Sequence, residues 1–247
     1  TIYAEPNKAK DKPAVEFKTD AVDLENKFNA ALSGLKKNLI KVYGYENPVL
    51  IEGAEYPGIW LECGPLEGAV YGVINPQVAQ DNHRIFFHLQ RDDGYLPCWI
   101  RKDTSGTAQI QMVVPIAATA FETYLLTKDK AFLTEAYNAC VKWDNWLVKY
   151  RNTSKTGLCE AFCEYDTGHD NSPRWEGLPK ACPDNDARKC PEADALPYLA
   201  PDLSATVYGG RIALAKMAAI LNKPNEAKEW EKKAQAIRQN LLALCFD

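Results

Sequence analysis

The chain has 247 residues, of which 46% are hydrophobic, and its 29 basic and 33 acidic residues give a formal net charge of −4. A chain of this length and hydrophobicity can bury a sizeable core, which excludes disorder of the whole chain. The charges are mixed along the chain without a basic stripe, so nucleic acid is a poor candidate partner. Polar residues interrupt every apolar stretch well before the roughly 20 residues that a membrane span requires.

Residues 1–18 are rich in Lys, Pro and Asp and predict an extended lead-in, followed by one domain over residues 19–247. The chain begins at Thr1 with neither an initiator Met nor an apolar signal segment, which is typical of a processed or trimmed chain. We expect the protein to be secreted or periplasmic.

Apolar residues recur at alternating steps of three and four in six segments, the spacing of helices with one buried face. These predicted helices contain residues 28–42, 78–89, 110–124, 133–147, 207–221 and 230–244. Short connections at 127–129 and 222–224 force antiparallel neighbours, with Asp129 as an N-cap and Pro224 in a first helical position. The sequence therefore predicts an all-α fold of repeated hairpins.

Long segments at 43–74, 91–107 and 151–202 separate the predicted hairpins. We expect these loops to gather on one side and to carry the function. Short strands are expected within 47–60 and 157–165. The last helix runs to Asp247 without a capping glycine or polar tail, and we expect the natural protein to continue.

The eight cysteines are spread over a chain too large to need a disulfide scaffold. Cys182 and Cys190 bracket a polar loop, which makes them candidates for a loop-closing disulfide in an exported protein. The Cys-x-x-Cys spacing of structural zinc sites is absent, so no metal is predicted. Nucleotide-binding fingerprints and a serine-nucleophile elbow are also absent, and we expect no cofactor.

Residues 160–175 concentrate four acids, a His, an Arg and aromatic side chains in one predicted loop. A carboxylic acid beside hydrogen-bonding residues and an apolar wall can act as a general acid, and an Arg can hold a sugar hydroxyl or carboxylate. The plainer alternative is that Asp170 and Asn171 form an Asx-turn while Trp175 lies in the core.

Two further loops, 56–65 and 91–99, place aromatic residues beside acids and turn residues. Aromatic faces stack on the C–H faces of sugars, while acids and amides take the hydroxyls. Each loop taken singly is more often a packed corner than a sugar subsite. If the hairpins form a ring, however, all three loops would converge into one cleft.

Residues 168–175, Gly-His-Asp-Asn-Ser-Pro-Arg-Trp, resemble the acid-bearing loop of the six-hairpin glycosidases that include mannosylglycerate hydrolase and processing α-glucosidase, with trehalase more distant. Residues 90–97, Gln-Arg-Asp-Asp-Gly-Tyr-Leu-Pro, resemble an early loop of the same family. Residues 202–205 resemble the start of the helix that follows the acid loop. The likeness covers about residues 50–247.

The resemblance implies an (α/α)₆ toroid, of which this chain is an incomplete portion, and inverting hydrolysis of an α-linked glycoside or oligosaccharide. It implies Asp170 as the general acid, opposed by a base carboxylate about 6.5–9.5 Å away. Around this acid, Asn171, Arg174 and Trp175 would shape the sugar site. Weaker candidates for lining the same cleft are Trp60, Tyr95, Trp99 and Gln111.

The family's general base is a Glu in the last third of the toroid, and no residue of this chain matches it. We therefore expect the base beyond Asp247 or in a second chain that completes the toroid, and no hydrolysis by this piece alone. One alternative is a non-catalytic carbohydrate-binding or scaffold module on the same fold, which would lack a carboxylate facing Asp170. Another is a helical-repeat interaction protein, which would present an apolar groove.

Overall fold

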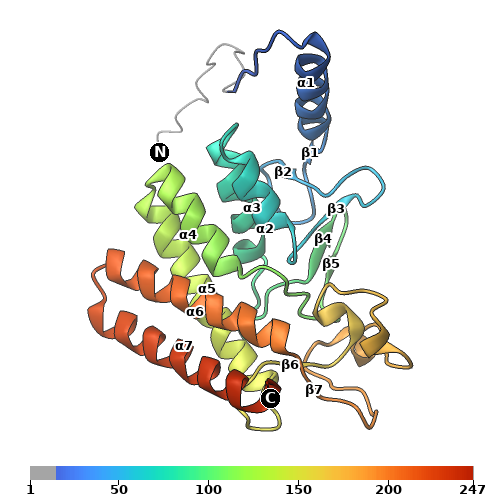
Figure 1. Cartoon of the computed structure of the whole chain (residues 1–247), viewed down its shortest axis with the longest axis vertical. Coiled ribbons are helices and arrows are strands. Elements are labelled where there is room, and N and C mark those ends of the chain that lie inside the picture. Colours follow the sequence, from blue (N-terminus) through green and yellow to red (C-terminus); the bar gives the residue numbers. More distant parts are fainter. Residues whose placement is uncertain (1–14, 247) are drawn as a thin grey trace.

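The computed structural model describes residues 15–246 and is mainly helical (Figure 1). Its helices are α1 (Val22–Lys37), α2 (Gly64–Tyr71), α3 (Pro76–His88), α4 (Ile116–Thr127), α5 (Lys130–Tyr150), α6 (Pro201–Ile220) and α7 (Pro224–Cys245). The prediction of an all-α fold is confirmed. Most of the predicted lead-in lies outside the described residues, and residues 15–18 have no regular secondary structure.

The structure differs from the sequence prediction in one additional helix and in two helix boundaries. Helix α2 falls within the predicted loop 43–74, because a helix this short shows no repeated apolar spacing. The first helix ends at Lys37, so positions 39–42, predicted on its face, lie outside it. Helix α4 begins at Ile116 and not near 110, because Pro115 cannot donate to a preceding helical turn and disfavours helical backbone before it.

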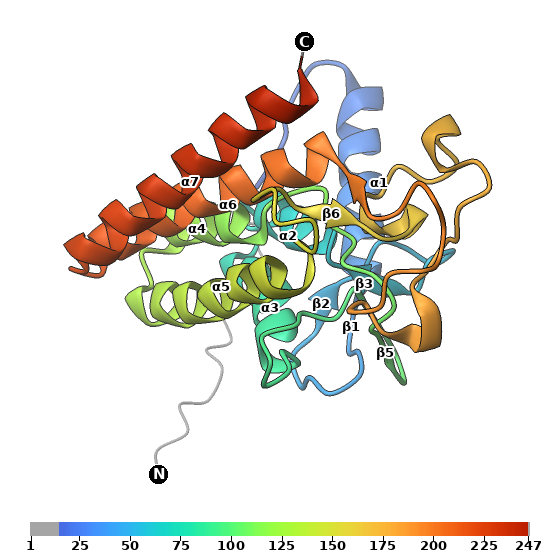
Figure 2. The ribbon, with the colours of Figure 1, turned by 90° about the horizontal axis from the view of Figure 1, so that it is seen from below.

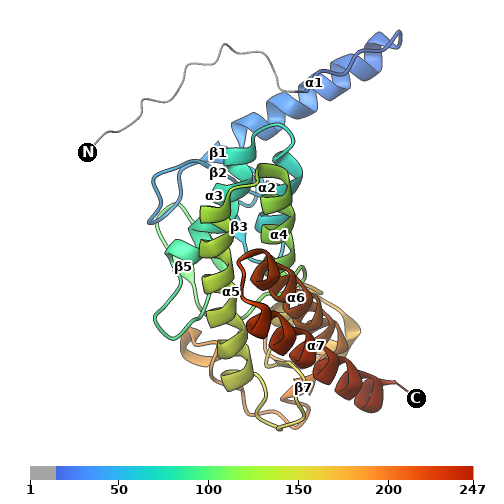
Figure 3. The ribbon, with the colours of Figure 1, turned by 90° about the vertical axis from the view of Figure 1, so that its left-hand side faces the viewer.

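Consecutive helices pack as the hairpins α2–α3, α4–α5 and α6–α7, with α6 and α7 side by side in both Figures 1 and 3. The Asp129 carboxylate caps α5 by accepting hydrogen bonds from the N–H groups of Ala131 at 2.9 Å and Phe132 at 3.1 Å. Pro224 opens α7. Both predicted helix starts are confirmed, and the short turns between paired helices follow from them.

Short antiparallel strands connect the loops. Strand β1 (Leu39–Ile40) pairs with β2 (Val49–Leu50), β4 (Trp99–Arg101) lies between β3 (Gly58–Trp60) and β5 (Ser105–Gly106), and β6 (Glu160–Ala161) pairs with β7 (Tyr198–Leu199). The strands expected within 47–60 and 157–165 are confirmed. Figures 1 and 2 show these strands and the segment 151–200 on one side of the hairpins, as the loop positions predict.

Helix α1 differs from the others because none of its side chains is buried. The sequence predicts a buried apolar stripe on this helix, and that expectation is wrong for the described residues. Figure 3 shows α1 projecting away from the hairpins, with no helix against it. No helix within residues 15–246 is both long enough and apolar enough to cross a membrane.

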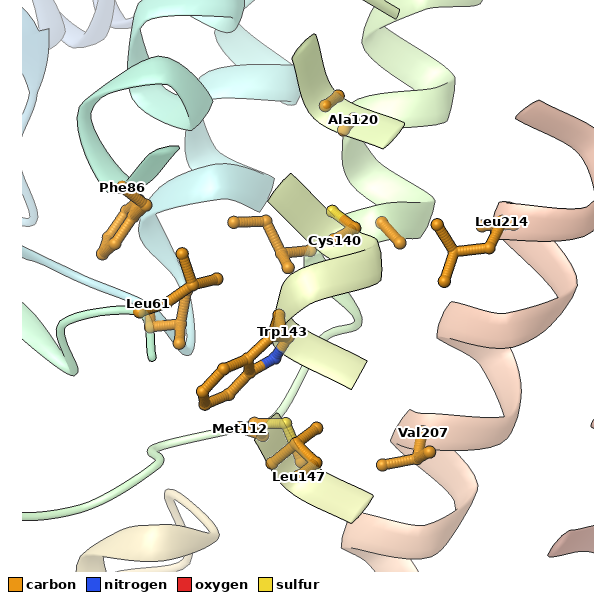
Figure 4. Close-up of a cluster of buried hydrophobic side chains, with 14 of the residues drawn as sticks. Leu61, Phe86, Met112, Ala120, Cys140, Trp143, Leu147, Val207 and Leu214 are labelled. Atoms are coloured by element: carbon orange, nitrogen blue, oxygen red, sulfur yellow. The ribbon is translucent and has the colours of Figure 1, made fainter. Parts of the chain in front are cut away.

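The main core lies where α3, α4, α5 and α6 meet. Figure 4 shows Phe86 of α3, Trp143 of α5 and Leu214 of α6 among its side chains. Trp143 stacks on Trp146 with 5.4 Å between ring centroids and an angle of 14° between the ring planes. Large aromatic rings of this kind remove much apolar surface from water when they are buried.

Buried polar contacts join neighbouring hairpins. On α3, the His83 ring places Nε2 2.9 Å from the Thr119 hydroxyl of α4, and burial lowers the pKa of His83 to about 4, which keeps the ring neutral. The Arg211 guanidinium of α6 donates to the Asp144 carboxylate of α5 at 2.7 Å, and both side chains are buried. These contacts set how the helices lie against one another.

Replacing Arg211 with Met should lower the free energy of unfolding by about 3–5 kcal/mol, because the Asp144 charge would stay buried without its partner. The matched control is Lys189→Met, which breaks an exposed ion pair with Asp184 and should change the stability little, because solvent screens exposed charges. Urea unfolding of both variants measures the difference. Equal costs would mean that the buried pair contributes no more than the exposed one.

Candidate active site

The segment 160–175, called the acid loop from here on, is anchored by a buried ion pair between Arg151 and Asp166. Arg151 follows directly after α5, and Asp166 ends a short 3₁₀ helix, η1 (Glu164–Asp166). The Asp166 carboxylate also accepts hydrogen bonds from the N–H groups of Phe162 at 2.7 Å and Ile110 at 2.8 Å. The acid loop is therefore held to both α5 and the segment that precedes α4.

Beyond this anchor, the backbone turns through left-handed conformations on either side of Asp170. Gly168 has a φ of +64° and Asn171 a φ of +59°. The Asn171 N–H donates to the Glu164 carboxylate at 2.5 Å, and the Glu164 side chain is only 4% exposed. The Asp170 side chain is thus exposed on a turn whose backbone is held by the hydrogen bond from Asn171 to Glu164.

The surroundings of Asp170 make its negative charge less favourable than that of a free aspartate. Although the side chain is exposed, partial burial raises its pKa, and the nearby charge of Glu164 raises it further, while Lys180 acts in the opposite direction. A carboxyl with a raised pKa keeps its proton closer to neutral pH, which is the property that a general acid needs.

A second carboxyl, Glu62, lies against the same turn. An added Cβ on Gly168 would lie 2.4 Å from Glu62 Oε2, so the turn packs directly on this side chain. Burial raises the pKa of Glu62, a hydrogen bond from Gln111 lowers it, and the charge of Asp170 raises it again. The structure therefore brings Glu62, Gln111 and Asp170 together from three separate loops.

Sequence reasoning missed Glu62, although loop 56–65 was singled out for its aromatic and acidic residues. Nothing in the local pattern separates this carboxylate from Glu52 or Glu67. Gln111, by contrast, was a predicted cleft residue, and it lies beside Glu62. It is 7% exposed, has a φ of +44°, and accepts a hydrogen bond from Gln109 at 3.0 Å.

Arg174 and Trp175 tie the far end of the acid loop to α6. The Arg174 guanidinium donates to the Asp202 carboxylate at 2.5 Å and lies 3.0 Å from His169 Nδ1. It also stacks over Trp175, at 4.7 Å from the ring centroid. Trp175 is 2% exposed and meets Tyr198 edge to face, as the core alternative predicts for this residue.

Tyr95 does not line a cleft in this structure. Its side chain is 1% exposed, its hydroxyl donates to the Gln109 carbonyl oxygen at 2.6 Å, and its ring packs against Trp143 and Trp146. This corrects its assignment as a sugar-stacking candidate, because an aromatic face covered by the core is closed to a ligand. Local sequence shows an aromatic residue beside acids but not which way it points.

Trp60 and Trp99 are cross-strand neighbours on β3 and β4. The Arg101 guanidinium lies over both rings, at 5.4 Å and 5.0 Å from their centroids. Trp60 is buried, whereas Trp99 is partly exposed. The two form one aromatic pair next to the loop that carries Glu62, and their predicted contact with a sugar stays a prediction.

The fold adds a second candidate partner for Cys182 to the pairing with Cys190 expected from the sequence. Cys182 and Cys190 are free thiols, and the Sγ of Cys182 lies 3.8 Å from that of Cys163. These two sulfur atoms and an Asp166 oxygen lie within 4.8 Å of one another, close enough for metal ligands. Asp166 is already paired with Arg151, however, and that positive charge opposes a bound cation.

Comparison with known families gives one match, over residues 69–247, to the mannosylglycerate hydrolase MGH1-like glycoside hydrolase domain. The chain belongs to this MGH1-like glycoside hydrolase family. The matched range contains the whole acid loop and starts after Glu62. No curated protein matches the sequence.

Solved structures share the fold of this MGH1-like chain. A GH63 mannosylglycerate hydrolase from Thermus thermophilus in complex with glucose has 18% identity and a TM-score of 0.64, over 87% of this chain and 63% of its own. The same enzyme with Tris and D-glycerate has 19% identity and a TM-score of 0.60, over 87% and 64%. The chain thus spans less than two thirds of these relatives, and they are helical toroids, as the sequence predicts for this fold.

Replacing Glu164 with Gln should lower the pKa of Asp170, because the variant removes a nearby negative charge that penalises the Asp170 anion. The Gln carbonyl oxygen can still accept the hydrogen bond from Asn171, so the turn should persist. A carbon-13 NMR titration of the Asp170 carboxyl measures the shift, with the exposed Glu176→Gln as control. If the pKa of Asp170 is unchanged in Glu164→Gln, the charge of Glu164 is not a cause of the raised pKa.

Replacing Gly168 with Ala should destabilise the protein more than replacing Gly177 with Ala. Both glycines have positive φ, at +64° and +77°, and share a backbone cost of about 1 kcal/mol. Only the Cβ at 168 meets other atoms, Glu62 Oε2 at 2.4 Å and Val113 Cγ2 at 2.5 Å, which should add about 1–3 kcal/mol. Urea unfolding compares the variants, and equal losses would argue against tight packing of the turn on Glu62.

Proposed function

We propose that this chain forms part of an inverting glycoside hydrolase that acts on an α-linked glycoside or short oligosaccharide, with Asp170 as the general acid. The observation that carries the proposal is the state of Asp170. Its side chain is largely exposed on the turn of an anchored loop. Partial burial and the nearby charge of Glu164 raise its pKa. Membership of a glycoside hydrolase family supports the same reaction class.

In the proposed reaction, Asp170 protonates the glycosidic oxygen as the bond to the anomeric carbon breaks. A second carboxylate activates water on the opposite face of the sugar, at about 6.5–9.5 Å from the acid. We propose that this base belongs to a part of the protein that the solved relatives possess beyond the length shared with this chain. Glu62 would then support the turn that carries Asp170.

The substrate should carry closely spaced hydroxyl or carboxylate oxygens. Asn171 and Lys180 line a shallow depression beside the acid loop, together with Glu164 and Glu176, and can donate hydrogen bonds to such groups. The titles of the solved relatives report complexes with glucose and with D-glycerate. We therefore propose glycosides of neutral sugars and of small hydroxy acids as the first substrates to test. Separately, we propose that the protein is secreted or periplasmic.

Replacing Asp170 with Asn in the full-length protein should lower kcat about 10²- to 10⁴-fold, because the amide cannot supply the proton. Proton NMR of fresh reactions with a panel of α-linked glycosides should show a β-anomeric product from the unaltered protein. Asp23→Asn on the projecting helix α1 is the matched control and should keep full activity.

Two outcomes would overturn the assignment. An α-anomeric first product would exclude inversion, and full activity of the Asp170 variant would exclude this acid. Sugar binding without turnover by the full-length protein would instead favour the non-catalytic carbohydrate-binding module.

A further inference from the structure

Three cysteines gather beneath the acid loop. Cys163 immediately precedes η1, and Cys182 immediately precedes a second 3₁₀ helix, η3 (Pro183–Asn185). Their sulfur atoms are 3.8 Å apart, and both side chains are almost completely buried. Cys190 is half-buried and packs against the same pair, together with Phe162. Cys190 is thus the most accessible of the three thiols.

The environment of this pair disfavours a metal ion. Both oxygens of the nearest carboxylate, Asp166, already accept hydrogen bonds, from the Arg151 guanidinium and from backbone N–H groups. Arg151 Nη2 also lies 3.7 Å from the Cys182 sulfur. A cation would have to displace or face this guanidinium. A sulfur–sulfur bond carries no charge and needs no additional ligand.

The backbone on either side of the two cysteines is already held together. The N–H groups of Glu164 and Tyr165 donate to the carbonyl oxygens of Pro179 and Lys180 at 3.0 Å and 3.1 Å. The Cys182 N–H donates to the Ala108 carbonyl oxygen at 2.9 Å. Two thiols held this close can be joined with little backbone movement.

The sequence between the two cysteines, residues 164–181, carries most of the proposed acid site. Asp170, Arg174 and Trp175 all lie within it. A covalent link between Cys163 and Cys182 would close residues 163–182, which include most of the acid loop, into a ring and would restrict the unfolded chain. The link would therefore stabilise the segment whose geometry presents Asp170.

We propose that Cys163 and Cys182 form a reversible disulfide that closes the acid loop, with Cys190 as the thiol through which a small-molecule disulfide oxidant enters. The proposal stands on the arrangement of the thiols and does not depend on Asp170 acting as an acid. It differs from the Cys182–Cys190 pairing that loop spacing alone favours.

The oxidation balances with a disulfide such as oxidised glutathione. The Cys190 thiolate attacks this disulfide and expels one glutathione thiolate, which leaves a mixed disulfide on Cys190. Cys182 then attacks the Cys190 sulfur and expels the second glutathione thiolate. Finally Cys163 attacks the Cys182 sulfur and releases Cys190. In sum, two protein thiols become one disulfide, and the oxidant takes their two electrons and two protons.

The test is to equilibrate the full-length protein with oxidised and reduced glutathione, block free thiols by alkylation, and map the linked peptides by mass spectrometry without reduction. Peptides containing Cys163 and Cys182 should be joined, with Cys190 alkylated. The oxidised protein should melt about 5–10 °C above the reduced protein. Cys163→Ala should reduce this difference and leave Cys182 joined to Cys190, because the last exchange cannot occur. Cys190→Ser should slow the appearance of the difference, and Cys245→Ser is the control that keeps it.

The proposal is overturned if the final linkage is Cys182–Cys190, or if all three thiols stay alkylatable under the most oxidising buffer. A parallel experiment with zinc tests the remaining alternative, which is a metal site at these cysteines. One equivalent of zinc that stays bound to the reduced protein through gel filtration, and that is lost in Cys182→Ala, would assign the cluster to a metal. Peptide mapping uses the unaltered protein, so the result does not depend on the folding of any variant.

Discussion

The buried ion pair between Arg151 and Asp166 is the constraint on which the acid loop depends. Both side chains have 0% exposure, and an unpaired charge in that position would cost several kcal/mol. Asp166 also accepts from the N–H of Ile110, and Arg151 donates to the carbonyl oxygens of Glu160 and Ala187 at 3.3 Å and 3.1 Å. One pair therefore fixes the end of α5, both sides of the acid loop and the segment before α4.

This anchor separates the roles of two aspartates that stand four positions apart. Asp166 is buried against a cation and several N–H donors, so its charge holds the loop together. Asp170 projects into solvent from the turn that Asp166 supports, and Glu164 beneath it makes its negative charge less favourable. The two side chains therefore differ in burial and in hydrogen-bond partners, so that one holds the loop and the other faces solvent.

The hairpin architecture explains why the candidate site is assembled from distant parts of the chain. Short turns join paired helices, and the long segments gather on one side, where they contribute Glu62, Gln111 and Asp170 (Figures 1 and 2). None of these residues lies on a helix, yet the loops that carry them are positioned by helices α2, α4 and α5. The solved structures share the fold over 87% of this chain at 17–19% identity.

The sequence by itself determined the all-α class, the hairpins with their starts at Asp129 and Pro224, and the loop that carries Asp170. These are local signals, since helical periodicity, capping and a contiguous motif act within a few residues. Only the tertiary structure decided that Tyr95 is buried, that Glu62 lies against the Asp170 turn, and that the sulfur atoms of Cys182 and Cys163 lie 3.8 Å apart. Burial and long-range contact depend on how separate hairpins pack, and no spacing within one loop encodes that.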